Sequence, residues 1–457
     1  MRSLLIALLA AFVFALGTPA AAAVEAVYAI TDVTVVPMDR ERTIPAQTVI
    51  VRDGRIAAMG PAARTKVPAG AIRIDGRGRF LMPGLAEMHA HVPQDVDGQW
   101  AKDVLFLYAA NGVTFARGML GAPGHLDLRA KLARGEVIGP RLYTSGPSLN
   151  GNSVASPEAA RRMVSEQKAA GYDFLKIHPG LDRARYDAIA AAAREHRIPF
   201  GGHVPDAVGL PRALEVGQAT VDHLDGYLPL LLRDGSALAG KDAGFFGSAL
   251  VPDADERKIA GVARRTRAAG VWNVPTDSLV HHVLLAGFST EDMAAREEMR
   301  YVPRQMLAGW KKARTDMQSQ PGYDPAAAAR FAQVRGRLIK GLHDAGAGLL
   351  LGSDAPQWFN VPGFSLHREL EYLVGAGLTP YQALATGTRE VARFLGAPRD
   401  FGTVAVGRRA DLILATGNPL RDVANVRRPA GVMLGGRWLP AAGIDTGLAV
   451  IAGRYRQ

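Results

Sequence analysis

Residues that can bind a divalent metal stand at the ends of short apolar runs along this chain: His89 and His91, Lys176, His203, His223 and Asp354. A barrel of parallel strands brings such strand ends together on one face, where active sites collect. The pattern therefore predicts a dinuclear metal site. Two cations held together are suited to activating water for hydrolysis.

His89 and His91 are two positions apart, so both side chains of the pair point to the same face of a strand. Taken alone, the pair also fits two ordinary polar strand residues. A zinc site of the β-lactamase kind needs an acid two positions after the second histidine. Pro93 stands there, which excludes that alternative.

Lys176 lies in the apolar run Phe174–His178, which is typical of a buried parallel strand. A charged lysine is costly there, so we expect its amine to be neutral, paired or chemically modified. A neutral amine can take up carbon dioxide and become a carbamate, whose two oxygens can bridge two cations. The alternative is a lysine whose stem lies along apolar surface while its amine reaches a surface carboxylate.

His203, His223 and Asp354 each have an ordinary explanation when taken alone. Buried histidines are commonly satisfied core residues, and Asp354 could cap the helix that follows it. Each residue, however, falls at the end of a different predicted strand. This joint placement favours one shared site over several coincidences.

The middle of the chain alternates short apolar strands with Ala-rich amphipathic helices, the pattern of βα units. Ser156-Pro157-Glu158 predicts one helix start, and another helix is expected from Ser365. Eight strands close a (β/α)8 TIM-type barrel, and we predict eight: Leu85–His91, Val113–Arg117, Arg141–Ser145, Phe174–His178, Pro199–Val204, Thr220–Leu224, Val271–Thr276 and Gly348–Asp354.

Both ends of the mature chain alternate like half-buried strands. Asp53-Gly54 predicts a hairpin turn near the N-terminus, and Gly435-Gly436 predicts another near the C-terminus. We therefore expect an α/β protein with a small β-sandwich built from both termini. The predicted domains are 1–23 (signal peptide), 24–82 (sandwich, first part), 83–400 (barrel) and 401–457 (sandwich, second part).

Two connections, from Gly226 to Gly270 and from Asp277 to Lys340, are long for single loops of a barrel. We expect extra helices there, lying over the barrel mouth where substrate selectivity would be set.

The N-terminus has Arg2, the apolar run from Leu4 to Leu16 and an alanine cluster ending near Ala23. This pattern predicts a secretory signal peptide and an exported, periplasmic or secreted protein, the alternative being an N-terminal anchor or a buried helix. We expect no membrane association after cleavage. The absence of cysteine excludes disulfides and a lipoprotein anchor.

The formal net charge of +11 comes from Lys and Arg that are spread along the chain and do not cluster with aromatic residues. We therefore expect no nucleic-acid partner, but a cation-rich surface that favours anionic substrates.

Several motifs resemble the amidohydrolase superfamily, in the subgroup with a carboxylated lysine that includes prolidase-like and Xaa-Arg-type dipeptidases. They are also similar to imidazolonepropionase-like proteins. The resemblance covers nearly all of the mature chain. Its motifs are Met82–His91, Gly171–Lys176, Gly202-His203, Asp222-His223, Gly352–Asp354 and Gly402–Leu412.

The resemblance implies how the ligands divide between two divalent cations, for which Zn²⁺ is expected. His89, His91 and Asp354 would hold one cation, His203 and His223 the other, and carboxylated Lys176 would bridge both together with a hydroxide. Lys176 argues against imidazolonepropionase itself, which resembles a mononuclear site without that lysine. The chain departs from many relatives at Arg117-Gly118, where they have Arg-Asp.

Further candidates surround this centre. Asp354 is expected to be catalytic, taking the proton of the attacking hydroxide and passing it to the leaving amine. His178 shares the inward face of Lys176 and is a candidate for contacting substrate, with a supporting hydrogen bond as the alternative role. Tyr227, four residues after His223, is a candidate donor to a tetrahedral oxyanion.

We therefore expect a hydrolase that cleaves the C–N bond of a small molecule such as a dipeptide or N-acyl amino acid. One alternative is an ester, lactone or phosphoester hydrolase with the same site. Another is a barrel that only binds metal or ligand, although the presence of Asp354 argues against it. A homo-oligomer is left open.

Overall fold

The computed structural model describes residues 26–456. The predicted signal peptide, residues 1–23, lies outside the described residues. Among residues 26–456, no helix has the length and apolarity needed to span a membrane.

The predicted central strands are all present, because each is a short apolar run bounded by turn residues. All their pairings are parallel, in one sheet of order β6-β7-β8 and another of order β13-β12-β11-β10-β9. The strands are β6 Leu85–Ala90, β7 Val113–Gly118, β8 Arg141–Thr144, β9 Leu175–Ile177, β10 Phe200–Gly202, β11 Thr220–Asp222, β12 Trp272–Val274 and β13 Gly348–Leu349.

Isolated parallel bridges join the edges of these two sheets. Ser145 pairs with Phe174 between β8 and β9, and Ala90 pairs with Ala355 between β6 and the segment after β13. The chain is thus an α/β protein, while closure into one barrel stays a prediction.

Helices follow most of the central strands, and α3 begins as predicted because the Ser156 side chain accepts from the Ala159 N–H. The largest buried apolar cluster includes Val262 of α7, Leu338 of α11 and Leu349 of β13. The helices are α1 Gln99–Ala110, α2 Gly124–Arg134, α3 Pro157–Ala170, α4 Arg183–Glu195, α5 Gly209–Val216, α6 Tyr227–Leu231, α7 Ile259–Ala269, α8 Asp277–Leu284, α9 Thr290–Ala294, α10 Arg304–Gln318, α11 Pro325–Asp344, α12 Phe364–Gly375, α13 Pro380–Thr386, α14 Arg389–Phe394 and α15 Ala441–Arg454.

The long connections do contain additional helices. The first connection holds α6, the kinked 3-10 segment η1 (Phe245–Asp253), the short 3-10 turn η2 (Glu256–Lys258) and α7. The second connection holds α8, α9, the 3-10 turn η3 (Glu297–Tyr301), α10 and most of α11. A further 3-10 turn, η4 (Val423–Val426), follows β14.

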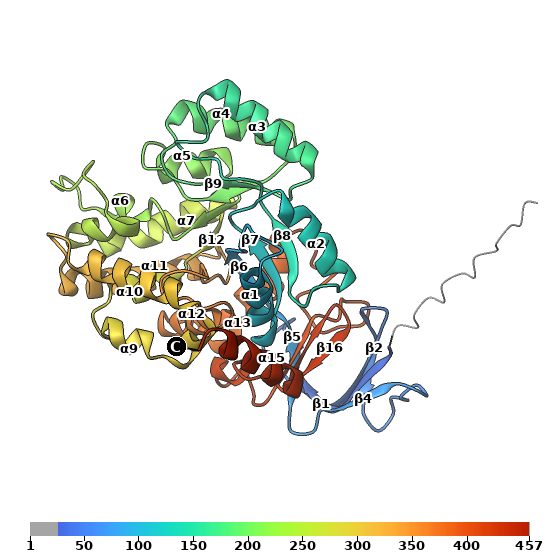
Figure 1. Cartoon of the computed structure of the whole chain (residues 1–457). Helices are drawn as coiled ribbons and strands as arrows, with labels where there is room; N and C mark the ends of the chain where they lie inside the picture. The colour runs from blue at the N-terminus through green and yellow to red at the C-terminus, as the bar shows by residue number, and fades with distance from the viewer. Residues whose placement is uncertain (1–25, 457) are drawn as a thin grey trace, which may run out of the picture.

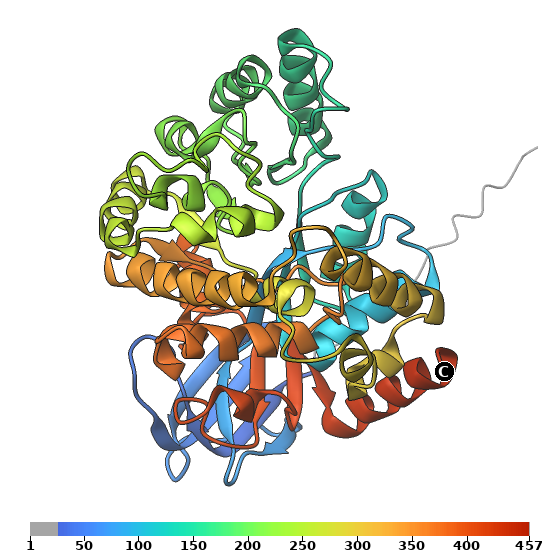
Figure 2. The same ribbon diagram turned by 90° about the vertical axis from the view of Figure 1, so that its left-hand side faces the viewer.

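Strands from both ends of the described chain form one sheet, in the order β16-β15-β14-β5-β1-β2-β3 with β4 on β1. The two ends meet where β5 pairs antiparallel with β14, and Figures 1 and 2 show the blue and red strands side by side. The strands are β1 Tyr28–Val35, β2 Ile44–Arg52, β3 Arg55–Pro61, β4 Ile72–Asp75, β5 Phe80–Pro83, β14 Leu412–Ala415, β15 Gly431–Leu434 and β16 Arg437–Pro440. A second sandwich layer and the domain boundaries stay predictions.

The predicted hairpin turns are confirmed at β2–β3 and β15–β16. After β16 the chain continues into α15, which packs on α1 (Figure 1). The approach of these helices is close, since a Cβ at Gly447 would lie 2.0 Å from the Phe106 ring.

Candidate metal centre

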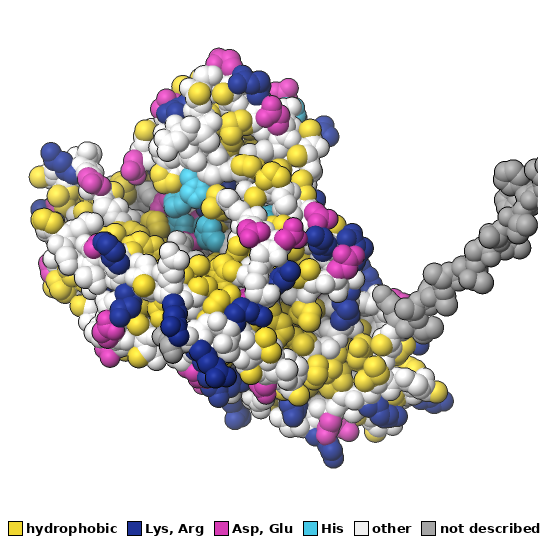
Figure 3. Space-filling model, in the orientation of Figure 1, with side chains coloured by type: hydrophobic (Ala, Val, Ile, Leu, Met, Phe, Trp, Pro, Cys, Tyr) yellow, Lys and Arg dark blue, Asp and Glu magenta, His cyan; other side chains and the backbone are white. Residues whose placement is uncertain are grey.

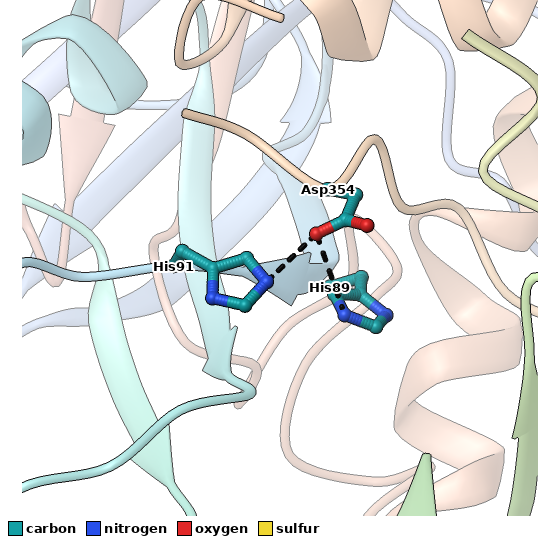
Figure 4. A group of neighbouring side chains, drawn as sticks. All are labelled: His89, His91 and Asp354. Atoms are coloured by element: carbon teal, nitrogen blue, oxygen red, sulfur yellow. Dashed lines mark ion pairs between the residues drawn. The ribbon is translucent and has the colours of Figure 1, made fainter. Parts of the chain in front are cut away.

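His89, His91 and Asp354 converge at the carboxyl end of β6. One ligand atom from each lies within 4.8 Å of the other two. Asp354 Oδ1 is 2.7 Å from His91 Nε2 and 3.5 Å from His89 Nε2, and Figure 4 shows both rings turned toward this carboxylate. Two imidazoles and a carboxylate are suitable ligands for a zinc-type cation.

The other predicted ligands lie against this group. Lys176 Nζ is 3.4 Å from His89 Nε2. The His223 ring is 4.6 Å from that of His89 and 4.5 Å from that of His203, between centroids. The structure therefore brings all six predicted ligands together, and Figure 3 shows histidines gathered in a hollow of the surface.

Hydrogen bonds fix the tautomers of the two histidines from β10 and β11. His203 Nδ1 lies 2.7 Å from Asp225 Oδ2 and donates to this carboxylate. The Thr276 hydroxyl donates to the carbonyl of Pro275, so it accepts from His223 Nδ1 at 2.8 Å. With the proton on Nδ1, each Nε2 keeps its lone pair for a metal.

His89 contacts Asp222 differently, in an ion-pair contact without hydrogen-bond geometry, with Asp222 Oδ2 2.8 Å from His89 Nδ1. Asp222 is buried and also pairs with the buried Arg117, whose Nε donates to the carbonyl of Met88. Arg117 therefore ties β6, the strand that carries His89, to the carboxylate that contacts the His89 ring.

Our sequence analysis missed these orienting residues: Asp222, Asp225, Thr276 and Arg117. A signal was available for Asp222, which directly precedes His223 in the motif already noted.

Two buried polar atoms of the centre make no hydrogen bond to any of residues 26–456. They are Asp354 Oδ1 and His89 Nδ1, and the close approaches of both atoms are ion-pair contacts without hydrogen-bond geometry. Buried polar groups are normally satisfied, so an orphaned carboxylate oxygen facing two imidazoles is what a metal site without its ion would show. The residues present therefore fit a bound cation.

Lys176 is fully buried beside Gly202. A Cβ at Gly202 would lie 2.8 Å from Lys176 Cδ and 2.6 Å from the carbonyl oxygen of Ile177. Only glycine leaves room there for the lysine side chain.

Burial governs the protonation of this centre. It lowers the pKa of Lys176 to about 8 and holds the pKa values of His89 and His223 well below their ordinary value. For Asp354 burial acts in the opposite direction, but the neighbouring His89 and His91 outweigh it and lower its pKa. These shifts favour neutral His89 and His223 and an ionised Asp354, the forms that bind metals.

Glu87 holds two ligand-bearing segments together. This buried side chain accepts from the N–H groups of His89 and Ser353 and from the Ser353 hydroxyl. Burial raises the pKa of Glu87 to about 8.

His178, the candidate for contacting substrate, lies at the edge of the centre. Its ring is 5.2 Å from that of His203, and its Nδ1 is 2.6 Å from Ser148 Oγ. Burial, with the charges of Lys176 and His203, lowers the pKa of His178 to about 2. The ring is therefore neutral and anchored beside the ligands.

The prediction for Tyr227 is wrong. Its side chain is fully buried, and its hydroxyl pairs with Asn273 at 2.7 Å and Thr266 at 3.0 Å. The start of α6 turns Tyr227 toward α7 and β12, so its hydroxyl is not available to an oxyanion.

Comparison with protein families matches residues 80–439 to the amidohydrolase family. The chain is 26% identical to an imidazolonepropionase of Symbiobacterium thermophilum over 81% of this chain and 84% of that protein. It is 22% identical to adenine deaminase 3 of Rhizobium meliloti over 82% of this chain but only 52% of that protein, so it spans about half the length of this relative.

Solved structures share the fold. The bottromycin amidohydrolase superposes with a TM-score of 0.72 at 24% identity, covering 94% of this chain and 91% of that one. A Xaa-Pro dipeptidase with methionine bound in its active site gives 0.66 at 16% identity, covering 91% and 100%. With the family match extending over most of the sequence and the predicted ligands gathered at one centre, the chain belongs to the amidohydrolase family, and its prediction as an amidohydrolase enzyme is confirmed.

Proposed function

We propose that this enzyme hydrolyses the C–N bond of a small amide, such as a dipeptide or an N-acyl amino acid. The observation that carries the proposal is the set of Nδ1 contacts at the centre. Asp222, Asp225 and Thr276 engage Nδ1 of His89, His203 and His223. Nε2 of His89 lies 3.4 Å from Lys176 Nζ and 3.5 Å from Asp354 Oδ1. The names of the relatives support a reaction at a C–N bond.

In this proposal the two parallel sheets are the arcs of one (β/α)8 barrel. The bridges at the sheet edges support closure, as do hydrogen bonds from the Met88 N–H to the Leu351 carbonyl and from the His91 N–H to the Ala355 carbonyl. The centre would then lie at the carboxyl ends of the strands, where barrel enzymes bind substrates.

The ligands divide into two groups. His89, His91 and Asp354 would hold one divalent cation, and His203 and His223 a second, with Zn²⁺ expected for both. Two such cations lower the pKa of a shared water and polarise a carbonyl. A carboxylated Lys176 would lie between the groups, in the space that Gly202 leaves open.

Asp354 would move the proton. Its carboxylate is held at the centre, with Oδ1 close to His91 and Oδ2 3.7 Å from His223 Nδ1. From this position it can accept a proton from attacking water and pass it to the leaving amine. The products are a carboxylate and an amine.

The test combines metal analysis with substrate screening of the purified, metal-replete protein. We expect about two zinc-type ions per chain and release of amine, detected with ninhydrin, from members of a dipeptide and N-acyl amino acid library. Turnover of esters, lactones or phosphoesters, without turnover of amides, would show that the enzyme catalyses a different hydrolysis. Full metal with no turnover of either panel would indicate a binding protein.

A further inference from the structure

A pair of aromatic residues from η1, Phe245 and Phe246, reaches the metal centre. The Phe246 ring stacks on the His223 ring, with 4.6 Å between centroids and 3° between planes, and lies 6.4 Å from the His203 ring. Phe245 stands 4.2 Å from Phe246 and 6.4 Å from Trp358. An apolar wall therefore adjoins two predicted metal ligands.

The backbone of this pair is held in an uncommon conformation. Phe246 has φ 52° and ψ 28°, in the left-handed region, where a bulky residue is an outlier. Gly247 follows with φ 95° and fits against Leu228, which a Cβ at Gly247 would approach to 2.8 Å. Strained backbone concentrates where a side chain must be held for binding or catalysis.

The pair lines a cavity of about 510 Å³ that opens onto His203. Val204, Pro205 and Pro229 belong to its apolar lining as well. A cavity with an apolar lining beside a few polar groups is the usual form of a small-ligand site.

The charged side chain at this cavity that has no ion-pair partner among the described residues is negative. Arg185, the one Lys or Arg among the lining residues, donates to Asp182 and to the carbonyls of Gly151 and Val154. Asp206 is exposed and makes no ion pair with any of the residues that the structure describes. The cavity therefore disfavours an anionic group, unlike the cation-rich surface expected from net charge.

The position of the cavity indicates which part of an amide it would receive. Asp354, the proposed proton carrier, must lie near the leaving amine. The cavity is instead lined by His203, whereas neither His91 nor Asp354 lines it. The acyl side of the scissile bond would therefore face the aromatic pair.

We propose that the enzyme selects amides with an apolar, uncharged, ring-sized acyl group, and that Phe246 is the specificity-determining residue. This inference rests on the proposed function. The flat face of Phe246 would pack on the acyl group while the scissile carbonyl lies at the metal centre. Burying an aromatic group against such a wall is expected to change selectivity by about 10- to 100-fold.

The experiment compares metal-replete wild type with Phe246→Ala and Phe246→Leu on phenylacetylglycine, acetylglycine and succinylglycine. We expect wild type to prefer phenylacetylglycine over acetylglycine by at least about tenfold in kcat/KM, with succinylglycine the poorest. The ratio of phenylacetyl to acetyl should fall about 10-fold or more in Phe246→Ala and less in Phe246→Leu, which keeps apolar bulk. Phe288→Ala removes an exposed phenylalanine elsewhere and should leave the ratio unchanged.

Calorimetric binding of phenylacetate and acetate to the same proteins separates this inference from the reaction. If phenylacetate binds more tightly than acetate and Phe246→Ala abolishes this difference, the cavity assignment is supported even when no amide is hydrolysed. The absence of amide hydrolysis would then reject the proposed function and not this inference. Amide hydrolysis with no acyl preference, or a preference that both Phe246 variants keep, would overturn the inference and leave the proposed function standing.

Discussion

The carboxylate of Asp354 has two separable tasks, holding a cation and moving a proton. Asparagine can still offer an oxygen to the cation but cannot accept the proton. We expect Asp354→Asn to keep a substantial share of the metal while kcat falls by about two to four powers of ten. Metal analysis and kcat on the same preparation test this, and near-wild-type kcat with full metal would make His178 the next candidate for the proton carrier.

Lys176 offers a second test at the level of one side chain. If it bridges the cations as a carbamate, Lys176→Ala should lose most metal and activity. Formate or acetate, added to the buffer, should restore part of both by occupying the vacated space. A variant that keeps full metal and turnover would show that Lys176 has a structural role only.

Residue type and spacing were enough to predict that the six proposed ligands lie together, because each stands at the end of a central parallel strand. Two of the partners of their Nδ1 atoms, Asp225 and Thr276, were beyond such reasoning. Asp225 and Thr276 lie just after strands, in segments with left-handed residues such as His223 and Thr276 that local propensity does not predict. The prediction for Tyr227 was wrong for a related reason, because the start of α6 determines the direction of its side chain.

In strand β10, the absence of a side chain at Gly202 makes room for Lys176. We expect Gly202→Ala to reduce both metal content and stability, because its φ is 119° and the new Cβ would collide with Lys176 and the Ile177 carbonyl.

Gly217→Ala is the matched control for this substitution, with φ 74° and no atom within 4 Å of the added Cβ. Backbone strain alone should cost it about 1–2 kcal/mol, with metal retained. Metal analysis and denaturant unfolding of both variants decide the matter. Equal losses of stability in the two variants, with full metal in both, would show that the space beside Lys176 is unimportant.

The contact between α8 and α12 should make stability depend on pH. Glu369 of α12 accepts from the N–H groups of Asp277 and Ser278 at the start of α8. Burial, reinforced by the charge of Asp277, raises the pKa of Glu369 above its ordinary value of 4.5. The folded protein therefore keeps a proton that the unfolded chain releases.

This contribution to stability is complete below pH 4.5 and is lost as pH rises through the raised pKa. Glu369→Gln cannot titrate, so the stability of wild type relative to this variant should fall with rising pH. Denaturant midpoints of both proteins, measured from pH 4.5 upward, give this difference in stability. A difference that is constant with pH would contradict it.

The sequence pattern located the central strands and the starts of α3 and α12, but the conformation of η1 was not predictable from it. Two adjacent residues with positive φ, Phe246 and Gly247, redirect that segment toward the centre. Such a turn depends on packing against Leu228 and His223, which come from other elements.

For the whole molecule, we propose export with removal of the N-terminal segment. The alanine cluster predicts a mature protein that begins near Val24. N-terminal sequencing of material from the exported fraction tests this. An intact Met1 in that fraction, or protein found only in the cytoplasm, would contradict the proposal.

At the same scale, the sequence predicted strands at both ends but not how they join. β5 and β14 are short, continuous apolar runs, and their antiparallel pairing depends on the rest of the chain bringing them together. Helix α15 was missed because its run from Ala441 to Arg454 holds several glycines, which lower helix propensity.

The pairing of β5 with β14 also governs when this protein can fold. Met82 and Ile413 are neighbours in the sheet, yet all the central strands and the helices between them are synthesised in the interval. A ribosome must therefore release almost the complete polypeptide before β5 gains this neighbour, and until then one edge of β5 stays unpaired. If the chain is exported as we propose, this late pairing lets the sheet close only after its last strands have crossed the membrane.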